Sequence, residues 1–178
     1  LHPRVRRQRQ MCIRDRRTEV DSIMNIRSHP QAIIMGDFND YPTNQSILKI
    51  LKAEAPPVKT NDLASTTDSA NASTVTPSSL KLYHLLARKA KSKNFGSYKF
   101  RGEWGLLDHL IVSGTLLNQS NHFFTSEEKA NVCLLPFLLK DDEKYGDKEP
   151  FRTYKGMKYQ GGISDHLPIY TDFELIVY

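Results

Sequence analysis

Three short stretches of the chain combine acids, an amide or a histidine with apolar runs. The first is Gly36-Asp37-Phe38-Asn39-Asp40, which follows the apolar residues 33–35. A run of this kind between a helical pattern and a turn predicts a buried strand. Because side chains alternate along extended backbone, Asp37 and Asn39 are expected on one side, a carboxylate beside a carboxamide at the mouth of a sheet. The alternative is an Asx-rich turn that ends at Tyr41-Pro42.

The other two stretches place charged or titratable residues at or inside strands. Asp108 and His109 lie in the apolar run 104–113, where an ionised carboxylate is costly without a partner. Asp165 and His166 open the final apolar run of the chain. Read alone, Asp108 could be a core acid with a partner, and His166 a capping or core histidine. Taken together and in this order, the residues predict a polar cluster at strand ends.

The three stretches resemble the last three signature motifs of the endonuclease/exonuclease/phosphatase superfamily, the fold of deoxyribonuclease I. The motifs are GDFND at 36–40, LLDHLIVS at 106–113 and SDHLP at 164–168. The intervals also fit, with 71 residues from Asp37 to Asp108 and 57 from Asp108 to Asp165. The resemblance implies an α/β (α+β) fold: half of a four-layer α/β/β/α sandwich, with a mixed, mainly antiparallel sheet and flanking helices.

The resemblance also implies a role for each residue of the cluster. Asp37 would orient and deprotonate the attacking water. Asn39 would donate to the phosphoryl oxygens and fix Asp37. His166 would donate to a non-bridging oxygen, while Asp108 accepts from its other ring nitrogen, as an acid does in a catalytic triad. Asp165 would be a ligand of a hard divalent cation, Mg²⁺ or Mn²⁺, held largely through water.

Several further residues are candidates for contacting the substrate. Asn39, Trp104, Arg152 and Tyr154 are expected to bind it, since an arginine suits phosphate. Surface salt bridges explain arginines at least as often. His109 follows Asp108 on the strand and faces the opposite side, so we expect it to be structural.

These residue types suit phosphoester hydrolysis. A phosphoryl centre needs a cation, an acceptor that aims water and donors for its oxygens. The resemblance therefore implies a hydrolase, a divalent-metal-dependent phosphoesterase of the nuclease type. A phosphatase of the same fold acting on phospholipids or inositol phosphates is an alternative. A second alternative is a non-catalytic nucleic-acid binder that uses the basic N-terminal residues, and a third is an inert truncated product.

The first half of the family's domain carries an asparagine, the main glutamate ligand of the metal and a further histidine or tyrosine. The residues before Asp37 contain no matching motif. We therefore expect residues 18–178 to be the C-terminal part of such a domain, without its N-terminal half. Half of a sandwich leaves an apolar sheet face uncovered, so the fragment is expected to be inactive alone and prone to aggregation.

The charge of the chain is unevenly distributed. The net charge is +5, but residues 1–17 contain seven arginines and one acid, so the remainder sums to −1. We expect residues 1–17 to be a disordered tail or a segment foreign to the domain, such as a cloning or assembly remnant. Cys12 and Cys133 form neither a disulfide framework nor a zinc site. No apolar run approaches a membrane span, and the compartment stays open.

The remaining patterns predict the elements that position the cluster. Helices are expected from Thr18 to about Ser28, after a cap at Thr43 or Asn44, and from about Ser79 to Lys91. Strands are expected at 96–102 and 104–113, and the last runs from Leu167 to about Val177. Residues 60–79 are expected to form a polar loop, and residues 140–149 a charged, mobile stretch.

Overall fold

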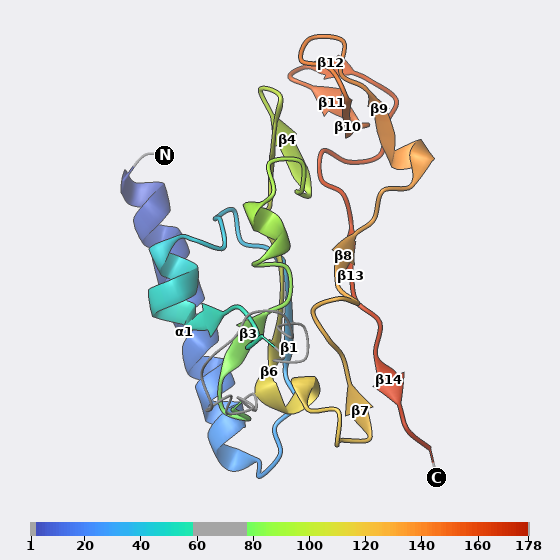
Figure 1. Ribbon diagram of the computed structural model, residues 1–178. Helices are drawn as coiled ribbons and strands as arrows, with labels where there is room; N and C mark the ends of the chain where they lie inside the picture. Colours follow the sequence, from blue (N-terminus) through green and yellow to red (C-terminus); the bar gives the residue numbers. More distant parts are fainter. Residues whose placement is uncertain (1–2, 59–77, 178) are drawn as a thin grey trace, which may run out of the picture.

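The computed structural model describes residues 3–58 and 78–177 (Figure 1). Its helical elements are α1 (Pro3–Ile26), the π-helical turn η1 (Ser46–Leu51) and the 3₁₀ segments η3 (Lys89–Lys91), η4 (Gly114–Leu117) and η5 (Pro136–Leu138). The strands before residue 114 are β1 (Ile33–Asp37), β2 (Ala53–Glu54), β3 (Leu82–His84), β4 (Tyr98–Phe100), β5 (Glu103–Gly105) and β6 (Asp108–Ser113). Those after it are β7 (Phe123–Phe124), β8 (Asn131–Val132), β9 (Leu139–Asp141), β10 (Lys148–Pro150), β11 (Tyr154–Lys155), β12 (Lys158–Tyr159), β13 (Ile169–Tyr170) and β14 (Glu174–Leu175). Within this described part, no helix combines the length and apolar character needed to cross a bilayer.

The centre of the molecule is a four-stranded sheet in the order β1-β6-β3-β2. β6 pairs antiparallel with both β1 and β3, and only β2 runs parallel to its neighbour. Figure 1 shows this sheet between α1 on one side and the strands β7, β8, β13 and β14 on the other. The expected α+β class, with mainly antiparallel strands and few helices, is confirmed.

The alternation of side chains along β6 divides the core between the two faces of the sheet. Ile111 packs with α1 and η1, in a cluster with residues such as Val20 and Leu51. Leu110 and Val112 point to the opposite face and pack in the other cluster. Full burial of one such side chain contributes about 1.5–3 kcal/mol, so β6 is anchored from both sides. Asp108 therefore starts a strand that cannot change register without exposing this core.

The segment after residue 117 forms a different kind of structure. Its strands pair only two at a time, as β13-β8, β14-β7, β10-β9 and β11-β12. The single last strand expected over 167–177 is wrong, because it divides into β13 and β14 with Thr171–Phe173 between them. Several large apolar side chains of the segment stay exposed, among them Phe137 at 61% and Leu175 at 66%.

Two helix predictions differ from the structure. The helix expected over 79–91 is wrong: residues 82–84 form β3, and only Lys89–Lys91 is helical. Leu82, Tyr83 and His84 are all buried, because β3 is covered on both faces. A strand of this kind lacks the alternation by which strands are recognised. The second helix is a single π-helical turn, and the cap expected at Thr43 or Asn44 is wrong, because Gln45 precedes the turn and makes no side-chain capping bond.

The first helix begins earlier than expected. α1 extends from Pro3, so residues 3–17 are helical where disorder or a foreign segment was expected. Its buried residues are Ile13, Val20 and Met24, one face of the helix, which packs against η1. Whether residues 1–17 are native to the domain stays a prediction. Most of the loop expected over 60–79 lies outside the described residues.

Candidate active site

Two carboxylates meet at one end of the sheet. Asp37 is the last residue of β1 and Asp108 the first of β6, and they are paired directly across the antiparallel ladder. The side chains of such a pair share one face, and like charges placed opposite one another are destabilising. The preceding Gly36 has φ of +138°, although a Cβ there would meet nothing within 4 Å. Glycine is therefore needed at this position for its backbone conformation and not for space.

The turn after β1 orients the carboxylate of Asp37. The backbone N–H of Asn39 donates to Asp37 Oδ1 at 2.7 Å, and its side-chain Nδ2 donates to Asp37 Oδ2 at 2.9 Å. Asn39 reaches this position with φ of 51°, a left-handed conformation in which Asn is enriched. The N–H of Phe38 continues the sheet by donating to the Leu107 carbonyl at 3.0 Å. The carboxylate and carboxamide are thus side by side, but through an Asx-type turn, the alternative that the sequence also offered, and not through extended alternation.

His166 reaches the cluster from the C-terminal segment. Its Nδ1 lies 2.6 Å from Asp108 Oδ2. Its ring packs against Tyr98 with 4.9 Å between centroids, and the two residues form an isolated β-bridge. Ser97 holds both His166 and Asp108 in place. Its carbonyl accepts from the N–H of Leu167, the residue after His166, at 2.7 Å, and its hydroxyl donates to Asp108 Oδ2.

The contact with Asp108 decides how the imidazole can act. A carboxylate only accepts hydrogen bonds, so the hydrogen of this contact belongs to Nδ1 of His166. The other ring nitrogen, Nε2, can then donate when the ring is protonated and accept when it is neutral. An acid that fixes the tautomer and orientation of a histidine in this way is the arrangement of a catalytic triad.

Two buried histidines support the cluster from the opposite face of the sheet. The N–H of Leu86 donates to His84 Nδ1 at 3.1 Å, so His84 carries its hydrogen on Nε2. That nitrogen lies 2.9 Å from His109 Nδ1, which must accept, and His109 Nε2 in turn donates to the Asp40 carbonyl at 2.8 Å. The expectation that His109 is structural and faces away from the cluster agrees with these contacts. Phe38 also packs on the His109 ring, at 5.0 Å between centroids.

This histidine pair is neutral near pH 7. Burial, with a further contribution from His109, lowers the pKa of His84 to about 3. Burial also lowers the pKa of His109, although its hydrogen bond to the Asp40 carbonyl acts in the opposite direction. Protonation of either ring would place two N–H groups face to face. The pair is therefore a fixed hydrogen-bonded link between β3, β6 and the turn after β1.

Asp37, Asp108 and His166 each offer a ligand atom, and these atoms all lie within 4.8 Å of one another. Carboxylate oxygens are the donors that Mg²⁺ and Mn²⁺ prefer, so the donor set fits a hard cation. Asp165, the expected metal ligand, is exposed and does not belong to this group. Its role as a ligand stays a prediction.

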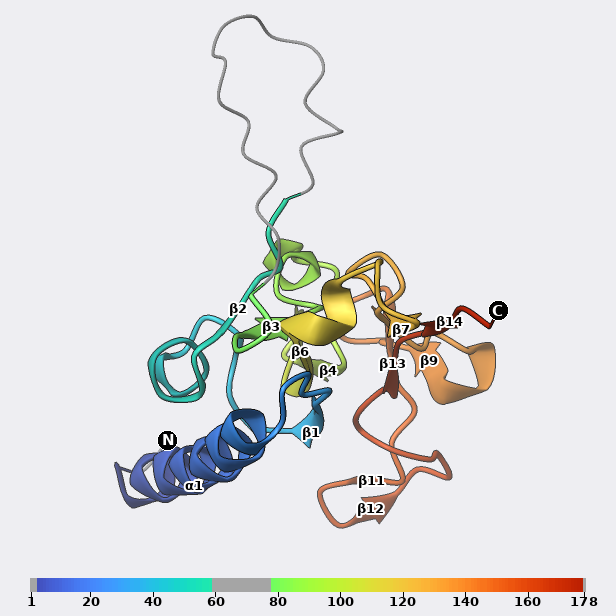
Figure 2. The same ribbon diagram turned by 90° about the horizontal axis from the view of Figure 1, so that it is seen from below.

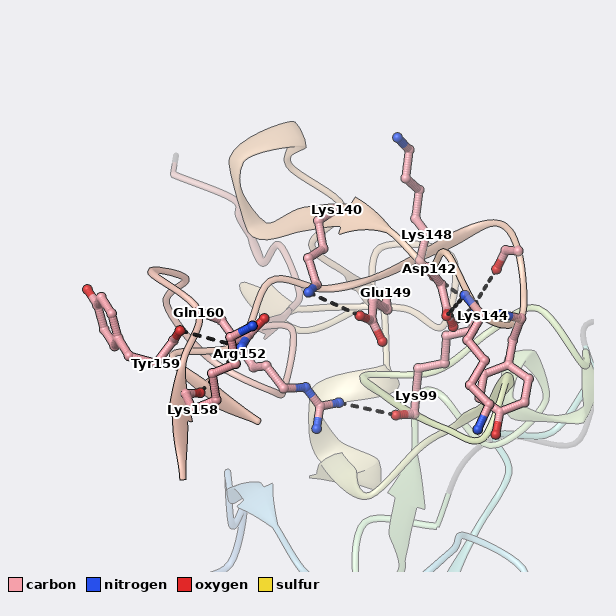
Figure 3. A network of polar contacts seen from close by, with 12 residues as sticks. Lys99, Lys140, Asp142, Lys144, Lys148, Glu149, Arg152, Lys158, Tyr159 and Gln160 are labelled. Atoms are coloured by element: carbon pink, nitrogen blue, oxygen red, sulfur yellow. Dashed lines mark hydrogen bonds and ion pairs between the residues drawn. The ribbon is translucent and has the colours of Figure 1, made fainter. Parts of the chain in front are cut away.

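The residues expected to contact the substrate differ in burial. Trp104 is half-buried against the core, with the Lys99 ammonium 5.9 Å from its ring centroid. Arg152 is half-buried; its Nη2 donates to the Lys99 carbonyl at 3.4 Å, and its Nε is buried without a partner. Tyr154 is exposed on β11. Figure 3 shows Arg152 reaching Lys99 beside the ion pairs of β9 and β10. Substrate contacts of these residues stay predictions.

A groove of about 830 Å³ runs between α1 and the edge strand β1 and reaches Asp37 and Asn39. Arg9 of α1 donates to the backbone carbonyl of Asn39. The arginine-rich helix therefore forms one wall of a groove that opens at the cluster.

The sequence matches the model of the endonuclease/exonuclease/phosphatase family over residues 2–66 and 58–175. The two matches together cover nearly the whole chain and include every residue of the cluster. The chain belongs to the endonuclease/exonuclease/phosphatase family. Neither a curated protein nor a solved structure matches it. The family's members are hydrolases of phosphoester bonds that typically depend on a divalent metal.

Sequence reasoning missed two supporting groups. Ser97 is a serine before a strand, and nothing in its sequence context indicates a contact with Asp108 at 11 residues' separation. His84 was placed in an expected helix, which concealed its pairing with His109. The sequence does contain a signal for His84. His84 and His109 both lie in apolar runs, and buried histidines need polar partners.

Proposed function

We propose that this chain contributes the nucleophile-activating part of a divalent-metal-dependent phosphodiesterase, with nuclease-type hydrolysis as the leading activity. The observation that carries the proposal is the convergence of Asp37, Asp108 and His166 from three separate segments of the chain. Membership of the family supports phosphoester chemistry at this cluster. A structural role alone does not account for a carboxylate pair placed opposite one another at a strand end.

In this proposal, Asp37 accepts the proton of an attacking water. Both of its oxygens already accept from Asn39, which holds the carboxylate in a fixed orientation. Nδ2 of Asn39 has a second hydrogen, which is available to a phosphoryl oxygen. His166 donates from Nε2 to another phosphoryl oxygen while Asp108 accepts from Nδ1 and stabilises the charged ring.

The bound metal would neutralise charge that develops on the phosphoryl oxygens. Asp37 would contribute a carboxylate oxygen to it, and Asp165 another through water. Asp108 Oδ2 already accepts from His166 and Ser97, so it is committed to orienting the imidazole. This leaves few protein ligands for the cation within the described residues, which supports the proposal that further ligands come from an N-terminal half of the domain.

We further propose that this chain is inactive by itself and prone to aggregation. β1 lies at the edge of the sheet, with Ile33 47% and Met35 57% exposed. An edge strand with exposed apolar side chains is a template for pairing with other chains. The same surface would be covered in a complete domain of two sheets.

The test compares this chain with the same chain extended upstream in its native reading frame. The substrate is bis(p-nitrophenyl) phosphate, with Mg²⁺ or Mn²⁺ and an EDTA control. We expect metal-dependent turnover by the extended protein, its loss in Asp37→Ala, and no turnover by the chain alone. Turnover by the extended protein that survives Asp37→Ala and His166→Gln would overturn the assignment of the cluster.

A phosphatase acting on phospholipids or inositol phosphates would use the same cluster. It would hydrolyse a monoester such as inositol phosphate in preference to an oligonucleotide, which the same extended protein can decide. The non-catalytic alternative, nucleic-acid binding through residues 1–17, would give binding whose steep salt dependence disappears when these residues are deleted.

A further inference from the structure

The ribbon formed by β11 and β12 projects from the rest of the chain (Figure 2). Its six residues from Tyr154 to Tyr159 are all exposed, and the tip residue Met157 is 99% exposed. Gly156 has φ of +62°, a left-handed conformation suited to a tight two-residue turn. The ribbon packs little apolar surface against the body, so its side chains are available to a partner.

The two faces of the ribbon differ in chemistry. Tyr154 pairs with Tyr159 on one face, with ring centroids 5.4 Å apart in an edge-to-face arrangement. Lys155 pairs with Lys158 on the other face. Two like charges directly opposite one another destabilise a two-stranded ribbon, so the pair of lysines lowers the stability of this ribbon. Departures of this kind from local rules are expected where a surface serves a function.

The neighbouring ribbon of β9 and β10 is organised differently. There, Lys148 pairs with Asp141 at 2.5 Å and Lys140 with Glu149 at 3.3 Å. Within residues 3–58 and 78–177, neither Lys155 nor Lys158 has a carboxylate partner. Residues 152–164 contain three cations and no acid. Figure 3 shows the Tyr159 ring pointing away from the ion pairs of β9 and β10. The β11–β12 ribbon thus presents uncompensated positive charge beside two aromatic rings.

The base of the ribbon is joined directly to the cluster. Gln160 N–H donates to the Thr153 carbonyl at 2.8 Å, and Ile163 N–H donates to the Phe151 carbonyl at 2.7 Å. Ser164 follows at once, and its hydroxyl accepts from the N–H of His166 at 3.1 Å. A phosphate held at His166 therefore lies only a few residues from the root of the ribbon.

We infer that the β11–β12 ribbon binds a nucleic-acid strand whose scissile phosphate is held at the Asp37, Asp108 and His166 cluster. This inference rests on the proposed function for the identity of the cluster. Bases stack on exposed aromatic rings, and lysines neutralise the flanking phosphates of the same polymer.

A lipid surface fits the ribbon less well. A ribbon that inserts into a bilayer carries its apolar residues at the tip and its charges at the root. Here the tip residue Met157 is flanked within one or two positions by Lys155 and Lys158. The two tyrosines lie at the root of the ribbon, opposite one another, where they can stack on bases of a bound strand.

The test measures binding of the full chain to labelled oligonucleotides, single-stranded and duplex, by fluorescence anisotropy in EDTA. Metal-free conditions keep binding separate from hydrolysis. The Lys155→Ala/Lys158→Ala variant should reduce the slope of log K against log salt by roughly 1.4–1.8, which corresponds to two lost phosphate contacts. The Tyr154→Leu/Tyr159→Leu variant should weaken binding of single strands by about 5- to 150-fold for each stacked base lost.

The matched control is Lys144→Ala/Lys148→Ala, which removes the same charge from the adjacent β9–β10 ribbon. It should leave the salt slope unchanged. Equal effects of the two lysine pairs, or no effect of either tyrosine change in a chain whose circular dichroism is unaltered, would overturn the inference. Binding of phosphatidylserine vesicles that depends on the ribbon, without oligonucleotide binding, would assign it to a membrane instead.

Failure of this inference is distinguishable from failure of the proposed function. Hydrolysis of bis(p-nitrophenyl) phosphate by the extended protein reports on the cluster and does not require the ribbon. If that hydrolysis is observed and the ribbon variants bind oligonucleotides normally, the ribbon inference fails alone. If the ribbon variants weaken binding but no turnover occurs, the binding assignment stands and the proposed chemistry fails.

Discussion

The four-stranded sheet and the segment after residue 117 each supply part of one cluster, but they fix their contributions differently. Asp37 and Asp108 are placed by the backbone ladder of β1 and β6, whose core packs on both faces. His166 belongs to a segment of two- and three-residue strands and is placed by Asp108, Tyr98 and one isolated bridge. A regular sheet thus sets the carboxylates, whereas the imidazole depends on a few specific contacts.

Each region also takes part in a buried polar network. Under the sheet it is the neutral pair His84 and His109. In the C-terminal segment it is the ion pair of Asp142 with Lys99 of β4, whose Nζ lies 3.0 Å from Asp142 Oδ2 and also donates to the carbonyls of Gly146 and Lys148. The neutral network connects three elements, whereas the ionic one joins β4 to the turn between β9 and β10. Disrupting them should therefore have global and local effects, respectively.

The contact that joins the two regions should give the largest effect. Asp108→Asn puts a neutral amide, which can donate as well as accept, in place of the carboxylate that fixes the His166 tautomer, so we expect turnover by the extended protein to fall roughly 10²- to 10⁴-fold. The measurement is the steady-state rate with bis(p-nitrophenyl) phosphate and Mg²⁺. Asp172→Asn, an exposed acid on the same segment as His166, is the control and should leave the rate unchanged. If the rate of Asp108→Asn stays within threefold of the parent's rate, the contact between Asp108 and His166 is not needed for turnover.

The histidine pair should matter most for stability. His109→Ala leaves the Nε2 hydrogen of the fully buried His84 and the carbonyl of the half-buried Asp40 without their partners. We expect a loss of about 2–5 kcal/mol in the free energy of unfolding, measured with urea. His29→Ala, at an exposed histidine, should change it by less than about 0.5 kcal/mol. A similarly small change in the free energy of unfolding of His109→Ala would mean that the histidine pair does not stabilise the surrounding fold.

The same pair should make stability depend on pH. The folded pKa of His84, about 3, lies below its unfolded value of 6.5, so the unfolded state binds the proton first as pH falls. The contribution of His84 to stability is then fully present above pH 6.5 and decreases by about 1.4 kcal/mol per pH unit on acidification toward pH 3. Urea unfolding at pH 7, 6, 5 and 4 measures the slope. His84→Gln should reduce it by about one proton, and an unchanged slope would assign the acid sensitivity to other groups.

The ionic network should give the smallest and most local effect. Burial would raise the pKa of Asp142, but hydrogen bonds from Lys99 and from backbone N–H groups lower it overall. The stability that this carboxylate contributes is therefore lost at a lower pH than the stability that the histidines contribute. Lys99→Met leaves this carboxylate without its cation, and we expect faster proteolysis within residues 141–149 while amide exchange in β6 stays the same. Lys148→Met, which breaks only an exposed pair, is the control. Loss of protection in β6 would show that the ionic network supports the whole fold.

Short-range patterns were enough to predict the sheet side of the site. An apolar run, a glycine and two polar residues located Asp37 at the end of β1 and Asn39 beside it, in the turn that follows. The motif around Asp108 predicted a buried strand, and its proximity to His166 followed from the family resemblance. The apolar run, Gly36, Asp37 and Asn39 lie within a few residues of one another, and over such short separations periodicity and turn chemistry are informative.

Contacts between distant parts of the chain were not predictable in the same way. β3 was assigned to a helix because residues 82–84 are buried on both faces and show no alternation. The last strand appeared continuous because nothing local marks the break between β13 and β14. The partners of Lys99 lie more than 40 residues away, and the sequence contains no pattern that links them.

The closing hydrogen bonds at the root of the β11–β12 ribbon have a consequence for how such a domain can diversify. A hydrogen bond between Phe151 and Ile163 closes the ribbon before the chain reaches His166. The outer part of the ribbon can therefore be lengthened, shortened or exchanged without displacing the imidazole. If the ribbon binds substrate as inferred, recognition and reaction can then vary as separate parts of one polypeptide. A graft that replaces residues 154–159 should transfer the preference for a polymer while leaving turnover of small diesters untouched.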